Sequence, residues 1–292
     1  MRERLQVLLL FLVPVVFMAG LHLLNLTLPV PVLGRSYVIR IELPDAGKEI
    51  GLPAIEGPQD ASRPLVVIDA GHGGHDPGAN GGGIQEKRLV LGLALALRDR
   101  LLKQGGIRVA LTRSDDTFLV LQERAEIARR MGADLFLSIH ADSAGDASGV
   151  RGASVYTLSD TASDEAAARF AARENSADRV NGISLSGQSD TVSAILVGLS
   201  QRRTQEESSE FASLITREGQ GGIVFHPAPR RSAALAVLRA PDVPSVLFEA
   251  GFITNPQDAQ RLTSEEGKAR FADAMERAIR IFFARNSAEP GQ

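Results

Sequence analysis

From Leu65 onward, short apolar runs alternate with longer stretches in which apolar residues recur every three or four positions. A compact apolar run is typical of a buried strand, and the longer period is typical of a helix that packs on a core. This order of strands and helices predicts an α/β domain with a mostly parallel sheet. The predicted strands are LVVID (65–69), IRVALT (107–112), DLFLSIHAD (134–142) and GASVYTL (152–158), and the predicted helices are EKRLVLGLALALRDRLLKQGG (86–106) and VLQERAEIARRMGA (120–133).

The second half of the chain continues this pattern less regularly. A helical region is predicted from Ser163 to Glu218, then strands at ALAVLR (234–239) and PSVLFEAGF (244–252), and a final helix at 264–284. We therefore expect one domain over residues 64–285, which contains a helical insertion at about 160–222, and a tail at 286–292. Proline and glycine are frequent ahead of this domain, so residues 35–63 are expected to form a linker with a short strand at SYVIRIEL.

The N-terminal segment is apolar and precedes this linker. Arg2 and Arg4 are followed by no charged residue until Arg35, and Leu5–Val16 is almost purely apolar. Such a pattern is typical of an export signal, so residues 1–34 are expected to be either a cleaved signal peptide or an uncleaved anchor. The run from Leu5 to Leu26 has about the twenty residues that a membrane-spanning helix needs. In both cases the rest of the chain is expected outside the cytoplasm, in the periplasm or anchored to the cytoplasmic membrane.

Composition narrows the function classes further. The chain has 292 residues, a formal net charge of −3 and no cysteine. A disulfide scaffold and a cysteine-ligated zinc site are therefore excluded. A charge so close to zero gives no electrostatic reason to expect nucleic acid as a partner.

The stretch IDAGHGGHDPGANGGGIQEK (68–87) is rich in glycine, as phosphate-binding loops are, but it also carries histidines and carboxylates. No G-x-x-x-x-G-K-[ST] motif is present, and a G-x-G-x-x-G pattern begun at Gly71 meets Asp76 where the third glycine belongs. A carboxylate at that position would repel a phosphate. The glycines are better explained as room for a sharp turn of the backbone beside a site.

Ionisable residues follow the predicted strands at one edge of the sheet, where ligands bind in open α/β folds. His72 follows the first strand, His140 and Glu249 end two later strands, and Glu86 opens the first helix. Two neutral imidazoles and a carboxylate, together with one open position for water, make up a catalytic zinc site. His72, Glu86 and His140 fit this set, although no H-E-x-x-H motif is present.

Two other histidines are weaker candidates. His75 is expected to be exposed to solvent in the loop, or to contact a metal ligand without binding the metal itself. His226, in VFHPAP, follows a possible strand; a structural role is favoured for it, with a place in the lining of the site as the alternative.

Four longer motifs resemble one family. VVIDAGHGGHDPGANG with QEK, TRSDDTFLVLQERAEIAR, ADLFLSIHADS and VPSVLFEAGFITNP are similar, in this order, to the zinc-dependent N-acetylmuramoyl-L-alanine amidases of the cell-division type. The resemblance spans about residues 64–284 and implies a three-layer α/β/α sandwich around a mostly parallel six-stranded sheet. It implies one Zn²⁺ bound by His72, Glu86 and His140, and Glu249 as the catalytic residue. Ala250 departs from the family pattern, which often has a small hydroxyl residue there, and little consequence is expected.

The implied reaction is hydrolysis of the amide that joins N-acetylmuramic acid to the L-alanine of the stem peptide in peptidoglycan. It would serve cell-wall remodelling and the separation of daughter cells. Two alternatives remain: a catalytically silent relative that binds peptidoglycan, and a zinc carboxypeptidase that acts on the stem peptide. Many relatives carry a peptidoglycan-binding domain before the catalytic one; too few residues precede Leu65 for such a domain here, and a membrane anchor would be expected to replace it.

The helical insertion carries one more candidate. In DEAAARFAARENSADRV, the apolar residues Ala167, Phe170, Ala171 and Ala177 share a stripe with Glu174, and a buried carboxylate needs a partner. The resemblance implies that Glu174 can occupy the open zinc position in a self-inhibited state, which an activator with a LytM-like domain relieves. The segment NGISLSGQSDTVSAILVGLSQ (181–201) is the expected docking surface for this activator. The alternatives are an ion pair of Glu174 with Arg173 or Arg179, and an insertion that merely covers one face of the sheet with two helices.

Overall fold

The computed structural model describes residues 51–145, 149–176, 179–180, 183–184 and 196–288. The predicted signal peptide or anchor, the predicted strand at 36–43 and most of the predicted docking segment at 181–201 lie outside these residues. In the part of the chain that is described, no helix is both long and apolar enough to cross a membrane.

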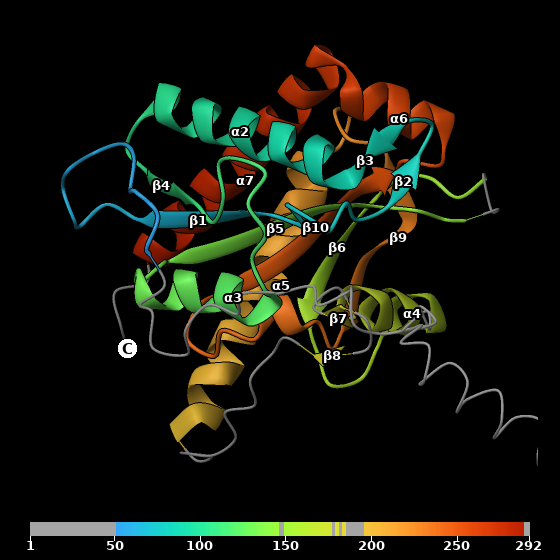
Figure 1. Ribbon diagram of the computed structural model, residues 1–292. Coiled ribbons are helices and arrows are strands. Elements are labelled where there is room, and N and C mark those ends of the chain that lie inside the picture. Colours follow the sequence, from blue (N-terminus) through green and yellow to red (C-terminus); the bar gives the residue numbers. More distant parts are fainter. Residues whose placement is uncertain (1–50, 146–148, 177–178, 181–182, 185–195, 289–292) are drawn as a thin grey trace, which may run out of the picture. The chain divides into compact units, whose positions relative to one another are not determined.

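The domain is a three-layer α/β/α sandwich, which confirms the expected fold (Figure 1). Six strands form the central sheet in the order β4–β1–β5–β10–β6–β9. Every pair is parallel except β10 and β6. The sheet strands are β1 (Leu65–Ala70), β4 (Arg108–Leu111), β5 (Leu135–Asp142), β6 (Ala153–Leu158), β9 (Phe225–Ala233) and β10 (Ser245–Phe252).

Helices cover both faces of the sheet. The helices are α2 (Glu86–Gln104), α3 (Leu121–Arg130), α4 (Glu165–Glu174), α5 (Leu196–Glu218), α6 (Pro256–Thr263) and α7 (Glu265–Ala288), with a 3₁₀ turn, η1, at Ala236–Leu238. Alternate residues of β1 enter different cores: Val66 and Ile68 pack with α2, α5 and α7, whereas Leu65 and Val67 pack with α3, α4 and η1. In Figure 1, α2 lies above the sheet, and α3 and α4 lie below it.

Minor strands complete the fold. β2 (Asn80–Gly81) and β3 (Ile84–Gln85) form a hairpin in the glycine-rich loop, and β7 (Arg179–Val180) pairs with β8 (Ile183–Ser184). Glu56 of the predicted linker forms an antiparallel bridge with Val109 of β4, so the end of that linker is attached to the sheet. Helix α7 reaches Ala288, three residues into the predicted tail.

One expectation and one alternative for the second half of the chain are wrong. ALAVLR is not a strand: it holds η1, and the sixth strand is β9, whose sequence FHPAPRRSA was not expected to pair. Pro227 and Pro229 are tolerated because β9 is an edge strand that, among the described strands, pairs only with β6. The two helices of the insertion do not share a face, because Phe170 of α4 and Phe211 of α5 belong to different cores.

Candidate metal centre

The carboxyl ends of β1, β5 and β10 bring four ionisable groups together. Within the sheet, Glu249 pairs directly with His140. His72 follows β1, and Glu86 begins α2 immediately after the glycine-rich loop. All four are buried. The convergence expected from the sequence is therefore present in the structure.

Two glycines make room for this cluster. A Cβ atom on Gly71 would lie 2.5 Å from the ring of His140. A Cβ atom on Gly78 would lie 2.6 Å from both Glu86 Oε2 and the ring of His72, and Gly78 has a φ of +64° that favours glycine. The loop thus supplies space beside the histidines rather than a phosphate cradle.

His72 is oriented by a carboxylate. Its Nδ1 donates to Asp76 Oδ2 at 2.7 Å, which leaves Nε2 to face the cluster. Nε2 lies 3.1 Å from Glu86 Oε1, yet it makes no hydrogen bond with any described residue. A histidine that donates one ring N–H to a carboxylate and points the other nitrogen into a buried cluster has the arrangement of a metal ligand.

His140 and Glu86 complete the set of donors. His140 Nδ1 lies 3.2 Å from Glu86 Oε1, and the two histidine rings are 4.9 Å apart. Two main-chain groups also hold Glu86: Ala79 N–H donates to Oε2, and Ala141 N–H donates to Oε1. These contacts fix the glutamate between the two imidazoles.

The charges of this cluster strongly shift its pKa values. Burial alone would lower the pKa of His72, but Glu86 and Asp76 raise it to about 10. Burial has the same effect on His140, and Glu174 and Glu86 raise its pKa to about 10. Glu86 is also buried, but the two histidines hold its pKa well below its ordinary value. The cluster therefore favours a cation: protons on the imidazoles in the metal-free chain, or a metal ion in their place.

Glu249 has a different environment from Glu86. It is 2% exposed; its Oε1 accepts from the main-chain N–H of Asp142, and its Oε2 has no hydrogen-bond partner among the described residues. Burial, with Asp142, Glu86 and Glu174 nearby, raises the pKa of Glu249 well above its ordinary value. A raised pKa strengthens such a carboxylate as a proton acceptor, which is what a general base needs.

Glu174 reaches the same cluster from α4. Its Oε2 lies 3.2 Å from His140 Nδ1 and 3.5 Å from His72 Nε2. Ligand atoms of His72, His140 and Glu174 all lie within 4.8 Å of one another, so these three could hold a metal ion. The neighbouring Arg173 lies 3.8 Å from Glu174 Oε1 and pairs more closely with Asp142. Ala177 and the side chain of Arg179 lie outside the described residues.

Asp142 is a functional candidate that the sequence did not single out. Burial raises its pKa to about 6, although Arg173 opposes this shift. A cavity of about 220 Å³ lies over the cluster, and Asp142 and Arg173 line it together with His72, Glu86 and Glu174. Its place directly after SIHA, at the end of a strand, was the available signal.

The two remaining histidines lie apart from this cluster. His75 is exposed, and its ring packs on Phe118 with the centroids 4.1 Å apart and the planes tilted by 43°. His226 lies on β9, where its Nδ1 accepts from Ala228 N–H and contacts Arg231. Both observations agree with the expectation that neither residue belongs to the donor set.

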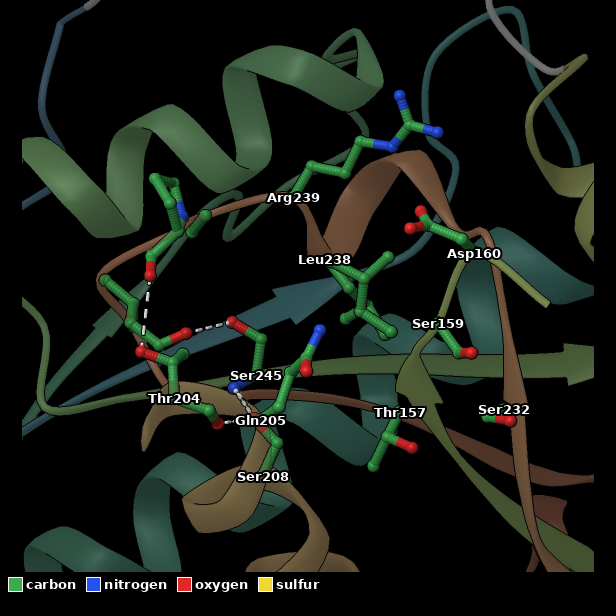
Figure 2. A pocket seen from close by; sticks show the side chains of 14 residues that line it. Thr157, Ser159, Asp160, Thr204, Gln205, Ser208, Ser232, Leu238, Arg239 and Ser245 are labelled. Carbon is green, nitrogen blue, oxygen red and sulfur yellow. Dashed lines mark hydrogen bonds between the residues drawn. The ribbon is translucent and has the colours of Figure 1, made fainter. Parts of the chain in front are cut away.

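A second cavity, larger than the one over the cluster, does not coincide with this chemistry. It has a volume of about 340 Å³ and lies at the opposite end of the strands, where β10 begins and the antiparallel β6 ends (Figure 2). Its buried hydroxyls already have partners: Ser208 Oγ accepts from Ser245 N–H and donates to Thr204 O, and Ser245 Oγ donates to Val243 O. The cluster of histidines and glutamates, not this cavity, identifies the candidate site.

Comparison with known proteins identifies the family. The model of the N-acetylmuramoyl-L-alanine amidase family matches residues 66–280. The chain is 39% identical over 224 residues to N-acetylmuramoyl-L-alanine amidase AmiA of Salmonella typhimurium, which covers 76% of this chain and 77% of the relative. AmiA of Escherichia coli is also 39% identical, over 221 residues that cover 75% of this chain and 76% of the relative.

A solved structure agrees with these matches. N-acetylmuramoyl-L-alanine amidase AmiC2 of Nostoc punctiforme superposes with a TM-score of 0.53 at 30% identity, over 76% of this chain and 98% of that structure. The protein therefore belongs to the N-acetylmuramoyl-L-alanine amidase family, whose members hydrolyse peptidoglycan.

Proposed function

We propose that this amidase cuts the amide between N-acetylmuramic acid and L-alanine with a Zn²⁺ ion held by His72, Glu86 and His140. The proposal rests on one observation: His72 Nε2, His140 Nδ1 and a Glu86 carboxylate oxygen converge within a buried cluster, where Nε2 lacks a hydrogen bond to any described residue. Two imidazoles and a carboxylate that leave one position open are the donor set of a catalytic zinc site. No cysteine is available to build another kind of zinc site.

Zinc bound by these groups would supply a Lewis acid for the amide carbonyl and would lower the pKa of a nearby water. Glu249 is proposed as the general base and acid. Its Oε1 is held by Asp142 N–H, so Oε2 stays free to accept the water proton. The raised pKa of Glu249 then suits it to deliver this proton to the leaving amine of L-alanine.

We further propose that the structure represents a resting state. Glu174 Oε2 lies beside the two histidines, where it would compete with the substrate carbonyl or with water for the fourth ligand position. Activity would require α4 to move away. An activator with a LytM-like domain is proposed to drive this movement by docking on residues 181–201, most of which lie outside the described residues.

The location and the cellular role follow from the substrate. Because peptidoglycan lies outside the cytoplasmic membrane, we propose that the chain is exported and acts in the periplasm, with residues 5–26 either spanning the membrane or removed. Cell-wall remodelling and daughter-cell separation are the proposed roles. Sequencing the N-terminus of the mature protein distinguishes cleavage from anchoring, and a cytoplasmic product that begins at Met1 would contradict both.

Substitution of the four groups tests these roles. His72→Ala and His140→Ala should abolish activity and lower the zinc content, whereas Glu249→Gln should abolish activity and leave zinc bound. His75→Ala is the matched control, since its ring is exposed, and its activity should stay within about twofold of wild type. The assignment is wrong if Glu249→Gln loses its metal or keeps substantial turnover, or if His75→Ala is as damaging as His72→Ala.

A further inference from the structure

We propose that Arg113 and Arg124 are positioning residues for the metal centre. Their guanidinium groups hold the backbone around His72 in the conformation that aims its ring at Glu86 and His140. This inference rests on the proposed role of His72 as a zinc ligand, and it assigns a role to two residues outside the donor set.

Arg124 of α3 binds the turn from one side. It is 2% exposed, and its Nη1 donates to Ala70 O and to Asp69 Oδ1, each at 2.8 Å. Its Nη2 donates to His72 O at 2.8 Å. One planar group thus fixes both the end of β1 and the carbonyl of His72 itself.

Arg113, just after β4, binds the same turn and connects it to α2. Its Nε donates to Ala70 O at 2.8 Å, and its Nη2 donates to Gly71 O at 2.7 Å. The same Nη2 also donates to Lys87 O at 2.9 Å. Gly71 precedes His72, and Lys87 follows Glu86. Arg113 therefore connects the backbone beside His72 to the backbone beside Glu86.

The backbone of His72 needs such support. Its φ is +59°, and among the described residues it has the only positive φ outside glycine. The left-handed conformation brings Cβ too close to the carbonyl oxygen, so a residue with a side chain adopts it only when its surroundings impose it. The two arginines bind the carbonyls of Ala70, Gly71 and His72, which are three successive groups of this turn.

Stability alone does not account for this arrangement. Two guanidinium groups are buried here: burial and the charge of Arg124 lower the pKa of Arg113, while Asp69, Asp116 and Asp115 oppose this shift. Thr112 Oγ1 and Ser138 Oγ also donate to Asp69, so the aspartate is itself held rigidly. Buried charges cost much free energy in water-free surroundings, and apolar side chains would fill the same space with less penalty. What the guanidinium groups add is a fixed direction for the three carbonyls.

The test measures metal binding rather than activity. Zinc affinity of the full chain is determined by competition with a chromophoric chelator, and the visible spectrum of the Co²⁺-substituted protein reports ligand geometry. Arg124→Lys and Arg113→Lys keep the positive charge but cannot reach all of these carbonyls. Each should alter the Co²⁺ spectrum and lower zinc affinity about 10–100-fold, which is the usual effect of removing a group that orients a metal ligand.

Arg280→Lys is the matched control, because Arg280 of α7 also holds a main-chain carbonyl, Gly105 O, which follows the end of α2 opposite to Glu86. It should leave zinc affinity unchanged. Unchanged zinc affinity and Co²⁺ spectra in Arg124→Lys and Arg113→Lys, with only a lower melting temperature, would overturn the proposal, and so would failure of both variants to fold. If His72→Ala keeps the zinc affinity of wild type, the proposed ligand set itself has failed, and this outcome is distinct from the others.

Discussion

The carboxylate of Glu174 lies 3.2 Å from Nδ1 of His140, although α4 and β5 carry these residues on different layers of the fold. Glu174 is 6% exposed, and its Oε2 makes no hydrogen bond with any described residue. Burying a carboxylate without a counter-charge is unfavourable, so the histidines, or a cation held by them, account for its position. The same contact places α4 across the site.

Removal of this carboxylate should activate the enzyme. Glu174→Ala is expected to raise the activity of the purified enzyme without activator by at least about tenfold, because a block worth about 1.4 kcal/mol leaves only a tenth of the molecules competent. Dye release from labelled peptidoglycan measures this. Glu165→Ala, an exposed glutamate on the same helix, is the control and should have no effect. Unchanged activity in Glu174→Ala would contradict self-inhibition by this residue.

Arg173 should hold α4 over the site. Its Nη2 pairs with Asp142 Oδ2 from a half-exposed position, and such pairs contribute about 0.2–1 kcal/mol. Arg173→Ala should therefore raise activator-independent turnover by at most about fivefold and speed hydrogen exchange in α4. Arg169→Ala, which breaks only the exposed pair with Glu165, should do neither. An additive gain in the double variant Arg173→Ala/Glu174→Ala would show that Arg173 acts independently of the block.

Zinc binding should release protons over a wide pH range. In the metal-free chain the pKa values of His72 and His140 are raised to about 10, so both imidazoles are protonated at pH 7 and must lose those protons to bind a metal. Zinc affinity should thus rise with pH from 6 to 9, by up to about 100-fold per unit, the slope for two protons. Calorimetry in buffers of different ionisation enthalpy counts the protons. A slope that levels off above about pH 7, as ordinary histidines would give, would contradict the raised pKa values.

Adding one methyl group at Gly78 tests whether the metal centre needs the space beside the histidines. Gly78→Ala would place its Cβ 2.6 Å from Glu86 Oε2 and from the His72 ring, so zinc affinity should fall at least about tenfold. Gly82→Ala is a matched control, because its φ of +57° is also positive but its Cβ would meet nothing within 4 Å. Both variants should lose about 1–2 kcal/mol of stability from backbone strain. Equal zinc affinity in the two variants would show that crowding at Gly78 is unimportant.

The fold class and the convergence of His72, Glu86, His140 and Glu249 were predictable, because parallel strands bring their carboxyl ends to one edge. It was not predictable that FHPAPRRSA, rather than ALAVLR, forms the sixth strand. An apolar run does not reveal whether it crosses the sheet or fills the core beside it, as Leu235, Val237 and Leu238 do. The prolines of β9 argue against a strand unless its position at the edge is already known.

The contacts that hold the backbone of the proposed metal ligands, such as the pair of Asp69 and Arg124, were not predicted either. Asp69 within the apolar run LVVIDA requires a buried partner, and this was the available signal for a buried cation. The partner itself, Arg124, is 55 residues away in sequence; its spacing from Leu121, Ala125 and Ala128 puts it on the buried stripe of α3, but arginine as a residue type favours the surface. Such long-range pairing depends on the packing of α3 against the sheet, which sequence periodicity does not specify.

The most direct measurement is mass spectrometry of the products released from purified peptidoglycan by the zinc-loaded Glu174→Ala enzyme. The predicted products are whole stem peptides with a free L-alanine N-terminus, together with glycan strands that lack peptides, and a chelator or His140→Ala should abolish both. Free amino acids would indicate a carboxypeptidase, and no release at all would indicate a silent binding protein. Whole peptides released undiminished by the His140→Ala variant would contradict the proposed metal centre.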